Sequence, residues 1–324
     1  MMQKQENVTP LPGVAATIGA GFELVTRHLW LAAVPVVLDL FLWLGPRLGF
    51  NALIEQLIDR LATMPMIVDP QPMLEVMLAR TNLFTYLSVA LVGVPALMTG
   101  LTPEKTPLQP AVVEVTGWGE WAGFFLGLTL VGLLLAAVYY TLIARAVGGP
   151  EARQWDNVAV HSGRTFARLI GLSILFVFLM ALILIPVSMV GAVLGLLSQF
   201  AATIVVLAAP VLLLWLVIFM SYTPQGMALN RRPFFPALLE SVRIFQLNLL
   251  PASGLLLLVV LITQVMNWLM LSADDGSWLT LASVLGHAFV STALVTAMFI
   301  FYRDRYAVAF AAGRPEAAAE QPKQ

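Results

Sequence analysis

The chain contains no cysteine and very little charge, and both shortages limit what it can be. Without cysteine there are no disulfides, no iron–sulfur clusters and no thiol chemistry, and the common zinc ligand sets are missing. Charged residues make up 11% of the sequence, against roughly a quarter in soluble domains. The net charge of −1 provides no field that attracts nucleic acid. We therefore expect no nucleic-acid partner.

Catalytic and cofactor motifs are also missing. The three histidines, His28, His161 and His287, lie far apart, and none belongs to a His-Glu-x-x-His sequence. There is no Gly-x-Ser-x-Gly nucleophile motif, no P-loop and no dinucleotide-binding glycine pattern. We expect neither a metal nor a cofactor, and an enzyme is the least favoured of the function classes.

Apolar residues dominate instead, at 60% of the chain. Runs of 18 or more apolar residues, enough to cross a hydrocarbon layer of roughly 30 Å, recur along the sequence. The sequence therefore predicts an all-α integral membrane protein with six spanning helices. We expect these helices at residues 29–46, 121–147, 169–196, 201–222, 250–272 and 279–302. The predicted organisation is an N-terminal lead and span (1–46), an extracytoplasmic insert with amphipathic or re-entrant helices (47–120), a five-span core (121–310) and a disordered cytoplasmic tail (311–324).

The ends of the predicted spans alternate in charge. Arginines flank one set of ends, from Arg145 to Arg303, whereas the turn at 197–200 is neutral and the turn at 274–275 is acidic. Because basic residues are retained on the cytoplasmic side, the arginine side and the C-terminus are expected there.

One segment of the insert, residues 83–101, leaves the number of spans open. It is apolar but short, and Pro95 interrupts it. It could be a seventh span, a re-entrant segment or an interfacial helix. A seventh span would place the N-terminus outside, whereas the other two interpretations place it inside.

A basic, amphipathic lead that runs into an apolar helix occurs three times, and this repetition favours six spans. The leads are Ile18–Trp30, Val158–Ile170 and Leu238–Leu250, and aligning them places Gly21–Leu29 over Ser162–Ile170 and Ser241–Leu249. Such leads are expected to lie in the headgroup layer, with their arginines toward lipid phosphate. The candidate contacts with anionic headgroups are Arg27, Arg164, Arg168, Arg231, Arg232 and Arg243. The same arginines would be present if they served topology alone.

Polar side chains inside the predicted spans are the candidates for a functional site. Asp39 is the one formal charge deep within a predicted span, and a carboxylate there is costly unless it is paired, hydrated or protonated. Further polar residues lie at similar depth from the outer helix ends: Ser188, Gln264, Asn267, His287 and Ser291. They are predicted either to line a hydrated cavity, with Asp39 bonded to His287 or Gln264, or to form separate bonds between helices.

Two Gly-x-x-x-Gly sequences, Gly123–Gly127 and Gly191–Gly195, predict close approach of helices. Because the motif is common in apolar helices, we expect it to mark packing within the chain.

The repeated basic lead, apolar hairpin and signature Phe245-x-x-Asn248-Leu249 resemble uncharacterised bacterial polytopic membrane proteins. These are families often grouped with the membrane domain that accompanies some glycerophosphodiester phosphodiesterases. The resemblance implies a protein of a bacterial cytoplasmic (inner) membrane but no activity, because the soluble phosphodiesterase domain is missing. The leading hypothesis is a non-enzymatic component that organises or assists membrane proteins or lipids, with the bilayer, other membrane proteins or anionic lipids as partners. The alternatives are a transporter or lipid permease that uses Asp39, and a membrane enzyme of unrecognised type.

Overall fold

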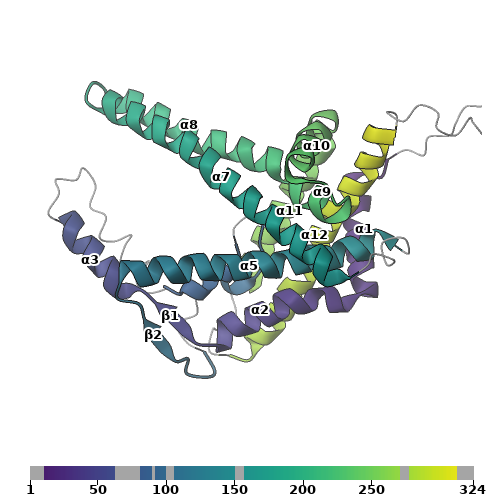
Figure 1. The fold of residues 1–324 in the computed structure, drawn as a ribbon, viewed down its shortest axis with the longest axis horizontal. Helices are drawn as coiled ribbons and strands as arrows, with labels where there is room; N and C mark the ends of the chain where they lie inside the picture. Colours follow the sequence, from purple (N-terminus) through teal and green to yellow (C-terminus); the bar gives the residue numbers. More distant parts are fainter. Residues whose placement is uncertain are drawn as a thin grey trace, which may run out of the picture.

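The computed structural model describes residues 11–62, 81–89, 92–99, 106–149, 157–270 and 277–311, and this part of the chain is almost entirely helical (Figure 1). The α-helices are α1 (Val14–Arg27), α2 (Ala33–Leu44), α3 (Asn51–Ala62), α5 (Trp118–Val147), α7 (Val158–Gly195), α8 (Gln199–Met220), α9 (Thr223–Leu229), α10 (Phe234–Leu247), α11 (Leu249–Met270) and α12 (Leu279–Ala311). Three short 3-10 turns are η1 (Leu29–Ala32), η2 (Leu83–Leu87) and η3 (Leu97–Thr99). Apart from Ala311, the predicted tail lies outside the described residues, as does the predicted turn at 274–275.

The all-α membrane class is confirmed, because five described helices are long and apolar enough to cross a bilayer. The predicted first span at 29–46 corresponds to the helical stretch Leu29–Leu44, which follows α1 after a bend of 96°. Its α-helical part, α2, has only 12 residues. A helix of that length rises roughly 18 Å, too little to cross the hydrocarbon layer alone. A sixth span exists only if the bent pair is counted as one.

The bend at His28 has a counterpart at Asn248, the position aligned with it in the third lead. His28 ends α1 with φ −136° and ψ 56°, and its Nδ1 lies 3.1 Å from the carbonyl oxygen of Leu24. Asn248 ends α10 with φ −129° and ψ 40°, and its Nδ2 donates to the carbonyl oxygen of Ile244 at 3.0 Å. The second lead has Leu169 at this position. A leucine cannot make such a bond, and α7 continues without a break.

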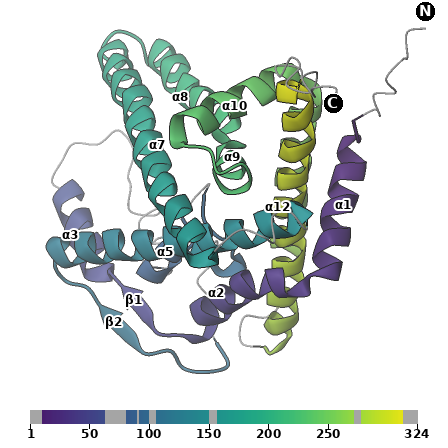
Figure 2. The same cartoon turned by 45° about the vertical axis from the view of Figure 1, so that its right-hand side comes forward.

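The first lead does not lie alone at a surface, because α1 packs along α12 (Figure 2). Gly21 makes this approach possible, since a methyl group at its Cα would lie 2.5 Å from the carbonyl oxygen of Ala293. Near the start of α1, the Arg305 Nη2 donates to the carbonyl oxygen of Pro12 at 2.8 Å. The side of α1 that carries Thr17, Gly21 and Val25 is therefore buried.

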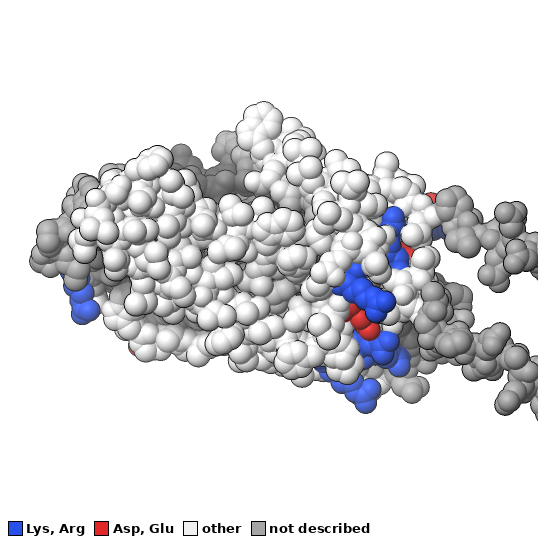
Figure 3. Space-filling model, turned by 90° about the horizontal axis from the view of Figure 1, so that it is seen from above, with Lys and Arg blue, Asp and Glu red and all other residues white. Residues whose placement is uncertain are grey.

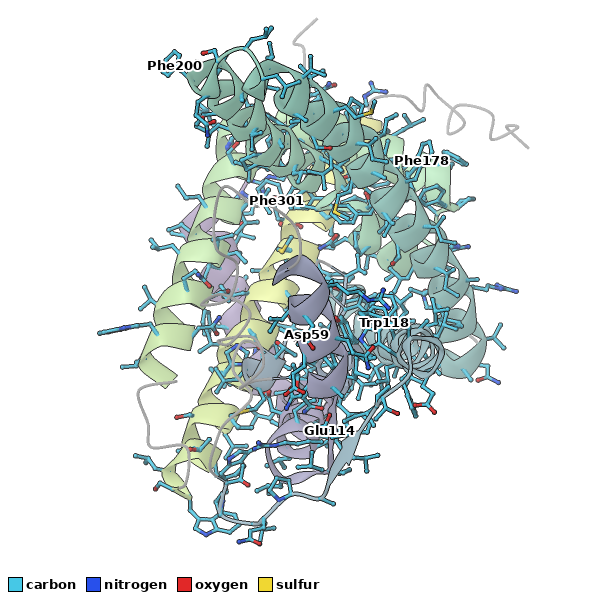
Figure 4. All side chains as sticks on the ribbon, turned by 90° about the vertical axis from the view of Figure 1, so that its left-hand side faces the viewer. Asp59, Glu114, Trp118, Phe178, Phe200 and Phe301 are labelled. Atoms are coloured by element: carbon cyan, nitrogen blue, oxygen red, sulfur yellow. The ribbon has the colours of Figure 1, made fainter. Side chains whose placement is uncertain are left out.

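Helices α7 and α8 form a long hairpin that leaves the rest of the bundle (Figure 1). Its side chains project outward, as Phe178 and Phe200 show in Figure 4. Gly191 faces α8, because a methyl group there would lie 3.0 Å from Val206 Cγ2, as expected for packing within the chain. That expectation is wrong for Gly123 and Gly127, since nothing lies within 4 Å of the corresponding positions on α5.

The predicted insert forms a small structure at the N-terminal end of α5. Strands β1 (Arg47–Gly49) and β2 (Val112–Glu114) pair in parallel, which the sequence did not predict. The amphipathic helix expected in the insert is α3, and its apolar side is anchored by buried Leu53 and Ile54. Figure 4 shows Asp59, Glu114 and Trp118 at this end of the molecule, on α3, β2 and α5. The strand pair thus brings the two ends of the insert together.

Candidate functional site

Residues 81–99 form a folded-in segment that runs along α5, and their described parts contain two short 3-10 turns and no spanning helix. The segment starts at the insert, where Leu48 N donates to Asn82 Oδ1 at 3.2 Å. It passes Gly132 in the middle of α5, where a methyl group would lie 2.5 Å from the carbonyl oxygen of Leu87. Further along α5, the Tyr140 hydroxyl donates to the carbonyl oxygen of Gly93 at 3.3 Å. Non-helical backbone at membrane depth is tolerated where protein buries it, as here.

The described part of residues 81–99, which we name the re-entrant segment after one of its three predicted interpretations, ends on Asp39. The Asp39 side chain is fully buried, and its Oδ1 accepts a hydrogen bond of 2.9 Å from the backbone N–H of Met98. Its other oxygen, Oδ2, lies 3.8 Å from His287 Nδ1 on α12. One turn beyond Asp39, Trp43 is buried and packs edge-on against Trp278 at the start of α12. The carboxylate is therefore sealed between α2, α12 and the re-entrant segment.

The approach of Asp39 to His287 is electrostatic. A separation of 3.8 Å is too long for a hydrogen bond, and both Asp39 Oδ2 and His287 Nδ1 lack hydrogen-bond partners within the described structure. An unpaired carboxylate deep in a membrane costs about 3 kcal/mol on insertion scales. The His287 ring is the neighbour that can offset that cost, which it does when it carries a proton. The contact therefore anchors α2 to α12 and holds the re-entrant segment through Met98.

The other predicted polar residues do not gather around Asp39. Ser188 is exposed on the outer part of the α7–α8 hairpin, and Gln264 is exposed on α11. Asn267 is half-buried on α11, while Ser291 is buried on α12, one turn from His287. Similar depth along a helix does not fix the direction in which a side chain points, so equal depth does not bring Ser188 and Gln264 to Asp39.

A cavity of about 410 Å³ lies beside the re-entrant segment and is almost entirely apolar. Its walls come from that segment and from α5, α7, α8, α9, α11 and α12, and neither Asp39 nor His287 lines it. Val177 on α7 and Val260 on α11 line the cavity and are 57% and 59% exposed, so it opens sideways on the apolar surface. Its volume falls within the range of roughly 300–1,000 Å³ that is typical of ligand pockets.

No pattern in the sequence predicted this cavity, because residues from seven distant segments build it. Tyr86 and Val92 of the re-entrant segment face the cavity, whereas Met98 of the same segment bonds Asp39. The short length of 83–101 and its Pro95 indicated a non-spanning segment, but not what it would contact. One segment therefore contacts both the sealed carboxylate and the open apolar cavity.

Basic residues gather at one end of the molecule. On the face drawn in Figure 3 they cluster where α9, α10 and the C-terminal end of α12 lie, and a long uncharged surface separates them from the other end. All six arginines predicted to contact headgroups lie on α1, α7 or α10, or on the turn before α10: Arg27, Arg164, Arg168, Arg231, Arg232 and Arg243.

Comparison with known proteins found no matching family model, no similar curated protein and no similar solved structure.

Proposed function

We propose that the chain is a multi-pass protein of a bacterial inner membrane that binds the hydrocarbon tail of a lipid in its lateral cavity. It handles or organises lipids, and no reaction is assigned to it. The bacterial origin rests on the resemblance of the repeated lead-and-hairpin unit. The cytoplasmic C-terminus rests on the basic end of the molecule.

The observation that carries this proposal is the cavity itself. It lies among helices that can span a membrane, its walls are apolar, and its rim opens toward the surface that lipid would cover. An apolar space of this kind excludes charged or sugar-like ligands, which would lose their hydration without compensating bonds. A hydrocarbon chain enters it without that cost.

The internal repeat is part of the same proposal. The matching helix ends at His28 and Asn248 support a common unit in the first and third leads. In this view the second unit lost the break and became the long α7, whose hairpin with α8 forms one wall of the cavity.

A lipid permease is the second candidate, because the re-entrant segment contacts both Asp39 and the cavity. A change at Asp39 could thus move one wall of the cavity, as transport would require. Movement of fluorescent phospholipid between leaflets of proteoliposomes distinguishes the two functions. A binder leaves the rate at that of protein-free vesicles.

Cavity filling tests the main proposal. Val217 on α8 lines the cavity, so Val217→Trp should occupy part of it, whereas Val211→Trp places the same ring on the exposed face of α8. Protein in nanodiscs is photolabelled with a phospholipid that carries a diazirine in its tail, and the labelled peptides are mapped. Val217→Trp should lower labelling of cavity peptides roughly tenfold, equivalent to ~1.4 kcal/mol of binding. Equal labelling in both variants would refute a tail site.

A further inference from the structure

The six predicted headgroup arginines divide into two groups in the structure. Three of them contact side chains of α1, α10 or α12. Arg27 pairs with Glu23, Arg232 pairs with Glu240 at 2.9 Å, and Arg243 lies 5.2 Å from the centre of the Phe310 ring. The other three are Arg164, Arg168 and Arg231. His161 lies on α7 with Arg164 and Arg168, and its Nε2 is 2.9 Å from the carbonyl oxygen of Ala228, three residues before Arg231. Positive charge is therefore concentrated at one place, around the start of α7 and the end of α9.

Part of this second group has a structural task. The short helix α9 is buried along its whole length, so its last carbonyl groups need donors from other helices. Arg168 Nη1 donates to the carbonyl oxygen of Met227 at 3.2 Å, and His161 Nε2 lies 2.9 Å from that of Ala228. Capping α9 therefore accounts for one N–H of Arg168 and for His161. It does not account for the exposed Arg164, and no acidic side chain of the described residues forms a salt bridge with Arg164 or Arg168.

Arg231 stands where the backbone favours glycine. Its φ of 53° is the one positive value at a non-glycine residue in the described chain. The turn after α9 is closed by Arg232 N, which donates to the carbonyl oxygen of Gly226 at 3.2 Å. Helices that end in this way usually carry glycine at the left-handed position, because it has no Cβ to strain. A guanidinium is thus added to the positive group at a backbone position that disfavours any side chain.

This positive group lies next to the inner end of the cavity. Leu172, one turn after Arg168 on α7, lines the cavity, and so does Pro224, one turn before Met227 on α9. One turn of helix is roughly 5 Å. Ser173 also lines the cavity, and its hydroxyl is buried without a hydrogen-bond partner in the described structure. An amphiphile with its tail in the cavity would therefore place its polar end among these arginines.

We propose that Arg164, Arg168 and Arg231 bind the phosphate of an anionic phospholipid whose tail occupies the cavity. Binding of the tail rests on the proposed function, whereas binding of the phosphate rests on the arginines. Guanidinium groups suit phosphate because their planar N–H donors match two oxygens at once. Each basic residue near an anionic surface strengthens binding roughly fivefold.

The test compares the retention of two lipids by variants that keep the α9 cap intact. Protein is equilibrated with vesicles of phosphatidylcholine and phosphatidylglycerol in equal amounts, extracted in mild detergent, and its bound lipids are counted by native mass spectrometry. The variants are Arg164→Gln and Arg231→Gly, and the control is Arg243→Gln, an exposed arginine of the first group. We expect the wild type and the control to retain phosphatidylglycerol preferentially, and each test variant to lose roughly fivefold of that preference.

Arg231→Gly separates a binding role from a structural one. Because glycine suits the backbone at this position, the variant should keep or raise the thermal unfolding midpoint while it loses phosphatidylglycerol. A preference for phosphatidylglycerol that survives in both test variants overturns the inference. If inorganic phosphate raises the thermal unfolding midpoint of lipid-free protein as much as phosphatidylglycerol does, the lipid assignment is overturned in favour of free phosphate.

Combining these variants with Val217→Trp separates this inference from the proposed function. If Val217→Trp leaves lipid retention unchanged while the arginine variants lose the anionic preference, the phosphate site stands and the tail site fails. If Val217→Trp lowers retention of both lipids while the arginine variants behave as wild type, the tail site stands and the inference is overturned.

Discussion

Helices α7 and α12 are both long enough to span a membrane, yet they are buried to opposite extents. The most apolar 18-residue stretch of α7 has a mean hydropathy of 2.9 and is 6% buried, whereas that of α12 has a mean hydropathy of 1.9 and is 67% buried. The less apolar helix is the one inside. In lipid, apolar surface gains nothing from burial, so polar groups and small residues determine which helices pack together. Helix α12 carries His287, Ser291 and Thr292 in its buried part.

The leads show the same contrast. Helix α1 turns at His28 and stays against α12, and α10 turns at Asn248, whereas the lead that carries Leu169 continues straight into the protruding α7–α8 hairpin. A polar residue at one position therefore accompanies a turn, and an apolar residue accompanies a helix that runs outward. The predictions below test how far the core and the hairpin differ.

The largest effect is expected at the core contact. His287→Ala should lower the free energy of unfolding by about 3 kcal/mol, because it leaves the buried Asp39 carboxylate without its ionic neighbour. The measurement is a reversible denaturation titration in mixed micelles. The double variant with Asp39→Asn should be more stable than His287→Ala alone, since a neutral amide needs no counter-charge. On the hairpin, Ser188→Ala should change stability by less than ~0.5 kcal/mol, and an equal effect at both sites would contradict the ionic interpretation.

A smaller effect is expected where the re-entrant segment crosses α5. Gly132→Ala places a methyl group 2.5 Å from the carbonyl oxygen of Leu87, and overpacking of this kind costs about 1–3 kcal/mol. Gly127→Ala is the matched control on the same helix, because nothing lies within 4 Å of its added methyl group. The control should gain up to ~1 kcal/mol from reduced chain entropy. If both variants changed the stability in the same direction, the segment would not be in contact with Gly132.

The smallest effect is expected at the helix break. Asn248→Leu gives the third lead the residue type of the second and removes the bond to the Ile244 carbonyl oxygen, which costs about 1 kcal/mol. The unfolding midpoint in the same micelle assay measures it. Gln246→Leu, two residues earlier on the exposed side of α10, serves as the control for added apolar surface. A neutral Asn248→Leu would mean that packing and the nearby Pro251 set the turn.

The sequence was sufficient to predict the long helices, because runs of apolar residues identify them without any tertiary information. It also singled out Asp39 and His287, since polar groups in apolar helices stand out. It could not separate His287, which lies beside Asp39, from Gln264, which is exposed, because depth along a helix says nothing of its rotation.

Features made by contacts between distant segments could not be predicted in this way. The bond from Met98 to Asp39, the path of residues 81–99 along α5 and the cavity all depend on which helices become neighbours. The bend at His28 had a local signal, a polar residue matched by Asn248 in the alignment. The structure explains this signal, because the side chains of His28 and Asn248 each lie within hydrogen-bond distance of the carbonyl group four residues earlier.

The contact between Asp39 and His287 also sets an order for biogenesis. Asp39 leaves the ribosome with the first helices, whereas His287 belongs to the last described helix of the chain. Until α12 is made, the carboxylate has no ionic neighbour in the bilayer, so inserting α2 is costly. We therefore expect α2 to remain in water, at the translocon or bound to an insertase until then. The first helices of this protein are therefore expected to reach their final positions in the membrane last.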